Sequence, residues 1–286
     1  MSQESRFCLY MPPLSSITSY MEMVDLAAAY GIKQLETLNL LDLSTPDKEF
    51  ARKLRAYADE KGISFPCVSL GLSLVDEDHR EALETAKGYV EVAAILGAPI
   101  FHHTIALEFE NYPHIADNFD LFYSRGLAAV RELYDYAETF GIRTVYEDQG
   151  FLFNGQENFA RFLRDVDRNV GIVADFGNIQ FVDEQVEDFI SRFQDRIVHV
   201  HVKDYRVTPA GSREQLPGEY RTKGGNYLLD TLVGQGSVHT DDAFRMLQRI
   251  GYRGAVALEC NPIGPDEEAG FRHNLEVINS YIHTYL

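Results

Sequence analysis

The sequence predicts a single-domain α/β fold, an eightfold (β/α) barrel, and three observations lead to this prediction. Short apolar runs alternate with longer amphipathic segments along the whole chain, and the alternation repeats eight times. Several amphipathic segments also stop at a glycine, the residue that most readily takes the left-handed conformation ending a helix. These glycines are Gly31, Gly62, Gly97, Gly141 and Gly251.

The apolar runs have the length and the β-branched or aromatic content of strands. In chain order they are 7–10, 34–38, 65–70, 100–103, 143–147, 172–175, 197–202 and 255–259. Between them, apolar residues recur at intervals of three and four, which predicts helices. The helices are expected at 19–30, 46–61, 77–96, 117–140, 157–168, 183–193, 241–250 and 266–285. No linker divides the chain, so one domain over residues 1–286 is expected.

One long interval interrupts this repeat after the seventh strand. Residues 205–236 are rich in proline and glycine, which predicts a long loop at the rim where the strands end. The loop is expected to act as a lid, with a surface excursion of no function as the alternative. Its basic residues are expected either to meet an anionic substrate or to be solvated; they are Arg206, Arg213, Arg221 and Lys223.

Composition excludes several classes of protein. A formal net charge of −18 and a sequence pI near 4.8 disfavour binding to nucleic acid or to an anionic membrane surface. No apolar stretch approaches the roughly 18 residues of a membrane span, and the start of the chain does not have the pattern of a signal peptide. We therefore expect a cytoplasmic protein. Three cysteines without a CxxC pair do not indicate a thiolate zinc site.

Four ionisable residues lie at the ends of strands five to eight: Glu147, Asp175, His201 and Glu259. Equivalent strand ends meet at one rim of a parallel barrel, so these side chains are expected to converge there. Strand alternation supports this, because an inward His201 leaves the valines of its strand facing the helices. Singly, each residue also fits a salt bridge, a loop cap or a core histidine. Together they predict a metal site, since unpaired inward carboxylates repel one another unless a cation joins them.

The ligand set favours Mn²⁺. Three carboxylates and one neutral imidazole form a hard, oxygen-rich site, for which Mg²⁺, Co²⁺ and Zn²⁺ are the alternatives. Other residues at the same rim are expected to contact substrate: His103 as a hydroxyl contact or proton shuttle, and Glu36, Lys203 and Arg206 as binding residues. The adjacent His102 leaves open which of the two histidines faces the site.

The order Glu, Asp, His, Glu on strands five to eight, the HVKD segment around His201 and the GQG segment at 234–236 resemble the xylose isomerase-like barrel superfamily. This superfamily includes sugar and sugar-phosphate isomerases and epimerases, hydroxypyruvate isomerase, inosose dehydratase and endonuclease IV. The resemblance implies a small carbohydrate substrate and a cis-enediolate intermediate, with Glu147 and Glu259 as acid and base. Dimers and tetramers are common in such families, so a homo-oligomer is compatible with the resemblance, but the sequence does not determine the oligomeric state.

The chain departs from the ketose 3-epimerases of that superfamily at two places. They carry a histidine three residues after the metal-binding aspartate and a further glutamate after the first ligand; this chain has Asn178 and Phe153 there. Asn178 is still expected to hydrogen-bond to substrate. The alternatives are a lyase or dehydratase acting on an inosose or a 3-keto-glycoside, and a barrel that binds a sugar or a partner without turnover. The acidic charge disfavours the DNA repair enzymes.

Overall fold

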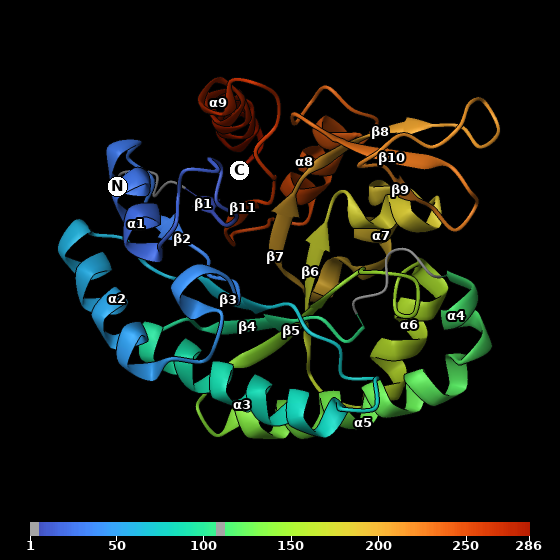
Figure 1. Cartoon of the computed structure of the whole chain (residues 1–286), viewed down its shortest axis with the longest axis horizontal. Helices are drawn as coiled ribbons and strands as arrows, with labels where there is room; N and C mark the ends of the chain where they lie inside the picture. The colour runs from blue at the N-terminus through green and yellow to red at the C-terminus, as the bar shows by residue number, and fades with distance from the viewer. Residues whose placement is uncertain (1–5, 107–111) are drawn as a thin grey trace.

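The computed structural model describes residues 6–106 and 112–286, and its central feature is a sheet of eight parallel strands (Figure 1). The strands are β1 (Phe7–Leu9), β2 (Gln34–Leu35), β3 (Cys67–Leu70), β4 (Ile100–His103), β5 (Arg143–Glu147), β6 (Gly171–Asp175), β7 (Ile197–Val202) and β11 (Val256–Leu258). Their order is β2-β1-β11-β7-β6-β5-β4-β3. Parallel bridges from Gln34 to Ser64 and from Thr37 to Val68 bring the two edges together. The predicted (β/α)₈ barrel is confirmed.

Helices surround the barrel on its outside (Figure 1). They are α1 (Tyr20–Ala29), α2 (Lys48–Lys61), α3 (His79–Leu96), α4 (Tyr112–Asp117), α5 (Phe119–Glu138), α6 (Gln156–Asp165), α7 (Val186–Phe193), α8 (Thr240–Arg249) and α9 (Glu267–Tyr285). Short 3₁₀ helices occur at η1 (Leu41–Leu43), η2 (Asn178–Val182) and η3 (Gln194–Arg196). Local signals set these boundaries: α2 begins where the Asp47 carboxylate accepts two backbone N–H groups and ends at Gly62, whose φ is 67°.

The strands have two faces of different polarity. On β7, Val200 and Val202 are buried in the apolar layer beneath the helices, whereas His199 and His201 are buried inside the barrel. This alternation follows from the two-residue repeat of a strand. A polar barrel interior is therefore enclosed by an apolar layer, and the polar side chains that reach the carboxyl ends of the strands are available for a site.

The segment 205–236 is not the irregular loop that the sequence predicts. It contains β8 (Asp204–Thr208), β9 (Tyr220–Arg221) and β10 (Tyr227–Thr231), which form an antiparallel sheet in the order β8-β10-β9 beside the barrel (Figure 1). Its strands are short and separated by prolines and glycines, so their alternation is hidden in the sequence. The Asp204 carboxylate fixes the end of this sheet by accepting the backbone N–H groups of Gly234, Gly236 and Val238.

No helix within the described part of the chain has the length and hydropathy of a membrane span.

Candidate metal centre

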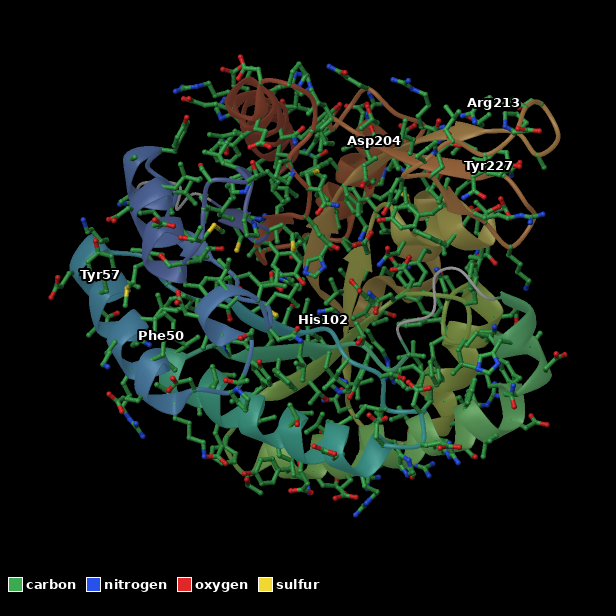
Figure 2. All side chains as sticks on the ribbon, viewed as in Figure 1. Phe50, Tyr57, His102, Asp204, Arg213 and Tyr227 are labelled. Atoms are coloured by element: carbon green, nitrogen blue, oxygen red, sulfur yellow. The ribbon has the colours of Figure 1, made fainter. Side chains whose placement is uncertain are left out.

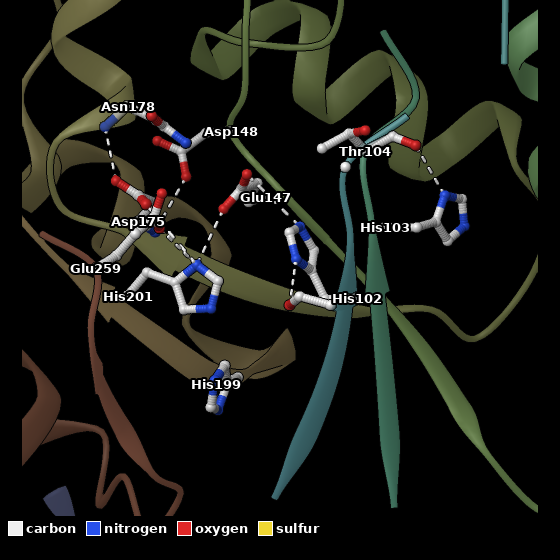
Figure 3. A network of polar contacts seen from close by, with 12 residues as sticks. His102, His103, Thr104, Glu147, Asp148, Asp175, Asn178, His199, His201 and Glu259 are labelled. Carbon is white, nitrogen blue, oxygen red and sulfur yellow. Dashed lines mark hydrogen bonds and ion pairs between the residues drawn. The ribbon is translucent and has the colours of Figure 1, made fainter. Parts of the chain in front are cut away.

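Glu147, Asp175, His201 and Glu259 converge at the carboxyl ends of β5, β6, β7 and β11, as expected (Figure 3). Nδ1 of His201 lies 3.2 Å from Oε2 of Glu147, 3.1 Å from Oε2 of Glu259 and 3.9 Å from Oδ2 of Asp175. One potential ligand atom from each residue lies within 4.8 Å of all the others. The geometry suits a single cation, and the role of these residues as ligands stays a prediction.

Strand register brings these four residues together. The four strands are consecutive in the sheet, in the order β11-β7-β6-β5, and Asp175 is the direct register partner of His201. The other oxygen of Asp175, Oδ1, accepts the backbone N–H groups of Gly177 and Asn178 at 2.8 Å. These two bonds fix the carboxylate and direct Oδ2 toward the centre.

Glu36 lies beneath the centre, where its position does not support the expected contact with substrate, and that contact stays untested. The side chain is fully buried, and its carboxylate accepts from Ser69 Oγ at 2.5 Å and lies 2.6 Å from Nε2 of His199 and 3.2 Å from Nε2 of His201. The residue follows the short strand β2 and lies deeper in the barrel than the ligand layer. A carboxylate at Nε2 favours the His201 tautomer that leaves Nδ1 free to ligate a cation.

His102, and not His103, faces the centre (Figure 3). Nε2 of His102 lies 3.6 Å from Oε1 of Glu147, and its Nδ1 lies 2.9 Å from Ser69 Oγ. His103 points to the opposite side of β4, where its ring nitrogens contact the Tyr146 hydroxyl at 2.8 Å and the Thr104 carbonyl at 2.9 Å. Burial lowers the pKa of His103 to about 3. The structure places His103 away from the centre, because adjacent residues of a strand point to opposite faces, and its predicted catalytic role stays untested.

Lys203 is close to two of the candidate ligands. Its Nζ lies 2.8 Å from Oε1 of Glu259 and 3.0 Å from Oδ2 of Asp175. Burial alone would raise the pKa of Glu259, but the charges of Lys203 and His201 outweigh it and hold that pKa well below its usual value. One ammonium among three carboxylates leaves two negative charges, which a divalent cation would balance.

The donor set fits a hard divalent cation. Oε2 of Glu259 is buried without a hydrogen-bond partner and faces His201. Burial would lower the pKa of His201, but Glu36, Glu147 and Glu259 outweigh burial and raise that pKa well above its usual value. The carboxylates thus attract positive charge to Nδ1, where a proton and a cation compete for one position.

Asp148 belongs to the same region and was missed at the sequence level. It is fully buried, and its Oδ1 accepts the backbone N–H of Asp175 at 3.2 Å while Oδ2 has no hydrogen-bond partner. Burial and the charges of Asp175 and Glu147 raise its pKa well above the usual value. Its position directly after Glu147 is the only signal that the sequence offers for it.

A cavity of about 180 Å³ opens above the centre. Glu259, Lys203 and Asn178 line its inner part, and the buried amide nitrogen of Asn178 has no hydrogen-bond partner. The expected contacts of Lys203 and Asn178 with substrate stay predictions. The cavity is smaller than the roughly 300–1,000 Å³ of drug-sized ligand pockets, which suits a small substrate.

The small antiparallel sheet supplies the outer wall of the cavity. Its lining includes residues that the sequence did not single out: Gln149, Tyr205, Tyr220, Asp230 and Asn261. Arg206 is exposed and is not among the lining residues, so its expected contact with substrate is not supported. The reason is again alternation, since Arg206 follows Tyr205 on β8 and points to the other face.

A (β/α)₈ barrel with three acidic side chains and a histidine gathered at the carboxyl ends of its strands defines the class of this protein. The chain belongs to the xylose isomerase-like TIM barrel family, whose model matches residues 24–281. The family resemblance of the sequence is thereby confirmed.

Similar proteins include sugar-converting enzymes. An inosose dehydratase from Lacticaseibacillus casei is 25% identical over 186 residues, which make up 63% of this chain and 60% of that enzyme. The match therefore spans less than two thirds of the relative's length. The structure of IOLI protein with a zinc atom has a TM-score of 0.77 and 18% identity over 99% of each chain. That of L-ribulose 3-epimerase has a TM-score of 0.75 and 16% identity, covering 98% of this chain and 95% of that one.

Proposed function

We propose that this protein is a divalent-metal-dependent isomerase or epimerase that acts on a sugar or sugar phosphate through a cis-enediolate. The observation that carries the proposal is the convergence of Glu147, Asp175, His201 and Glu259 on one point beside a small cavity. The sugar epimerase among its structural neighbours, and the zinc in another, agree with it. Mn²⁺ remains the cation that the oxygen-rich ligand set favours.

We assign the following roles in the reaction to residues of the chain. When bound, a divalent cation supplies Lewis-acid stabilisation of the negative charge that develops on substrate oxygens. Glu259 is held anionic beside Lys203, and we assign to it the removal of the proton α to the carbonyl, as the family resemblance implies for one of the two glutamates. Glu147, on the other side of His201 Nδ1, is placed to return it. Return at the neighbouring carbon gives isomerisation, and return on the other face of the same carbon gives epimerisation.

Elimination is the second candidate reaction, and the match to inosose dehydratase favours it. The first step is the same, because Glu259 would again remove a proton α to a carbonyl. The reactions differ afterwards: the enediolate either takes a proton back or expels a substituent from the adjacent carbon. An inosose or a 3-keto-glycoside would be the substrate of such a lyase.

Deuterium exchange tests the proposed function. The manganese-loaded protein is incubated in D₂O with ketoses, sugar phosphates, inososes and 3-keto-glycosides, and NMR follows deuterium uptake and products. We expect wash-in for one substrate class and a loss of at least about 100-fold in the Glu147→Gln and Glu259→Gln variants, since general acid–base groups contribute about that much. Glu157→Gln is the matched control, because the side chain of Glu157 is 88% exposed on α6.

Two results would contradict the proposal. The first is the absence of exchange across the panel although manganese is bound, which would leave a barrel that only binds. The second is wild-type exchange in both glutamine variants. Product analysis separates the candidate reactions, because elimination releases water or an aglycone whereas isomerisation and epimerisation release nothing.

A further inference from the structure

Two groups of residues line the cavity. The first group, here called the inner end, is Lys203 and Glu259, where the ammonium is already within 3.0 Å of two carboxylates. The second group, here called the outer end, is Asp230 of β10 with Asn261, Tyr205 and Tyr220, and the charges of Lys203 and Glu259 still act on the pKa of Asp230. The inner end adjoins the candidate metal centre, so the outer end is the part that remains to recognise the rest of a substrate.

Strand pairing places one acid and two tyrosines on the cavity side of the small sheet. Asp230 is directly opposite Tyr205 in the antiparallel register, and both line the cavity. Tyr220 is opposite Leu228, two residues before Asp230, and therefore lies on the same face. Aromatic rings and a carboxylate that accepts hydroxyl hydrogens are groups that bind an uncharged polyhydroxylated ring.

The same pairing turns the basic residues of the small sheet away from the cavity. Arg206 is opposite Leu229 and Arg221 is opposite Tyr227, on the other face. Arg213 forms an ion pair with Glu219. It lies near Tyr227 on the part of the small sheet that is far from the barrel (Figure 2). Lys203 is thus the one basic residue among the described cavity lining, and residues 1–5 and 107–111 contain neither lysine nor arginine.

The carboxylate of Asp230 is positioned to act on a ligand. Nδ2 of Asn261 lies 3.3 Å from Oδ2 of Asp230, which fixes the side chain at the cavity wall while leaving Oδ1 available. Asp204 also lines the cavity, but its carboxylate accepts three backbone N–H groups and is occupied by them. Asp230 is therefore the acid of the outer end whose charge a substrate would meet.

We propose that this cavity selects an uncharged sugar or cyclitol over its phosphate ester, and that Asp230 is the residue that determines this specificity. The inference rests on the proposed function and narrows its substrate class. A phosphate ester carries roughly two negative charges and would find Asp230 and Glu259 instead of an arginine cluster. At an effective dielectric constant near 20, one pair of like charges about 6 Å apart lowers affinity roughly 100-fold.

Matched pairs of ligands test this inference. Isothermal titration calorimetry on the manganese-loaded protein compares D-fructose with D-fructose 6-phosphate, D-ribulose with D-ribulose 5-phosphate, and myo-inositol with myo-inositol 1-phosphate. Inorganic phosphate reports any binding of the phosphoryl group to manganese alone. Because burial raises the pKa of Asp230, the titrations are made at pH 8.

The Asp230→Asn substitution is expected to change the affinities for uncharged ligands and for phosphate esters in opposite directions. The wild type should bind the uncharged member of at least one pair at least about tenfold more tightly. Asp230→Asn should weaken that binding roughly threefold to tenfold, through loss of a charged acceptor, and should strengthen binding of the ester. Asp195→Asn, the control on exposed η3 before β7, should change neither. A merely structural role of Asp230 would weaken both ligands alike.

Three results would overturn the inference: tighter or equal binding of the esters, parallel changes in Asp230→Asn, or no binding of any uncharged member up to about 20 mM. Its failure is distinct from failure of the proposed function. Deuterium exchange with phosphorylated substrates alone would remove the inference and keep the enediolate chemistry. If uncharged ligands bind selectively but none of them exchanges deuterium, the inference about specificity stands and the proposed enediolate chemistry fails.

Discussion

The two adjacent histidines of β4 offer a matched pair of perturbations. An asparagine side chain retains a polar group near the position of Nδ1 and removes Nε2. In His102→Asn, the lost atom faces Glu147 at 3.6 Å, while the contact with Ser69 can persist. In His103→Asn, the lost atom is the partner of the Tyr146 hydroxyl at 2.8 Å. The same substitution therefore affects the candidate metal centre at position 102 and the apolar layer outside the barrel at position 103.

The magnitudes follow from these contacts. Supporting groups that orient metal ligands typically contribute 10- to 100-fold in affinity, so His102→Asn should weaken Mn²⁺ binding by about tenfold or more. His103→Asn leaves the buried Tyr146 hydroxyl unpaired, at a cost of about 2 kcal/mol in the free energy of unfolding. For 286 residues, that corresponds to a decrease of about 3 °C in Tm. Its Mn²⁺ affinity should stay within about twofold of wild type.

Calorimetric titration with Mn²⁺ and thermal unfolding of the metal-free protein measure the two effects separately. The reasoning requires that affinity fall in His102→Asn and stability fall in His103→Asn. If His103→Asn weakened metal binding as much as His102→Asn did, the assignment of His102 to the centre would be refuted. Equal loss of stability without any change in affinity would refute the link between His102 and Glu147.

Two further predictions concern the support and the titration of His201. Glu36→Gln should lower Mn²⁺ affinity by about 10- to 100-fold, because the carboxylate that selects the His201 tautomer is lost. Calorimetric titration with Mn²⁺ measures this, with Glu157→Gln as the control. An unchanged affinity in Glu36→Gln would contradict the prediction. Since the surrounding carboxylates raise the pKa of His201, a proton competes with a cation for Nδ1. Affinity should therefore rise with pH, by about tenfold per unit below that pKa, with release of about one proton. Titrations from pH 6 to pH 8 in buffers of different ionisation enthalpy measure this, and a pH-independent affinity would contradict it.

Sequence periodicity located most of the barrel because the barrel depends on local alternation. The strands expected at 100–103 and 143–147 are β4 and β5 with the same bounds. The segment 205–236 was misjudged because strands of two and five residues between prolines and glycines resemble a loop. Pairing between such strands is decided by contacts that no single segment encodes.

The four candidate ligands were identifiable from the sequence because the carboxyl ends of successive barrel strands meet at one rim. Their spacing gave their proximity, which the structure bears out. The depth of Glu36 in the barrel and the choice between His102 and His103 could not be read in the same way. Each depends on where a strand begins within the closed sheet, and a shift of one residue reverses the side to which every side chain points.

The sequence alone determined the class of fold, the strand ends that carry acids and a histidine, and the acidic charge of the chain, since these follow from periodicity and composition. Only the tertiary structure decided which histidine faces Glu147, that Glu36 supports His201, and that the insertion presents Asp230 to the cavity while turning its arginines away. The physical reason is that a side chain's surroundings depend on register and closure between distant segments, which local sequence patterns do not specify.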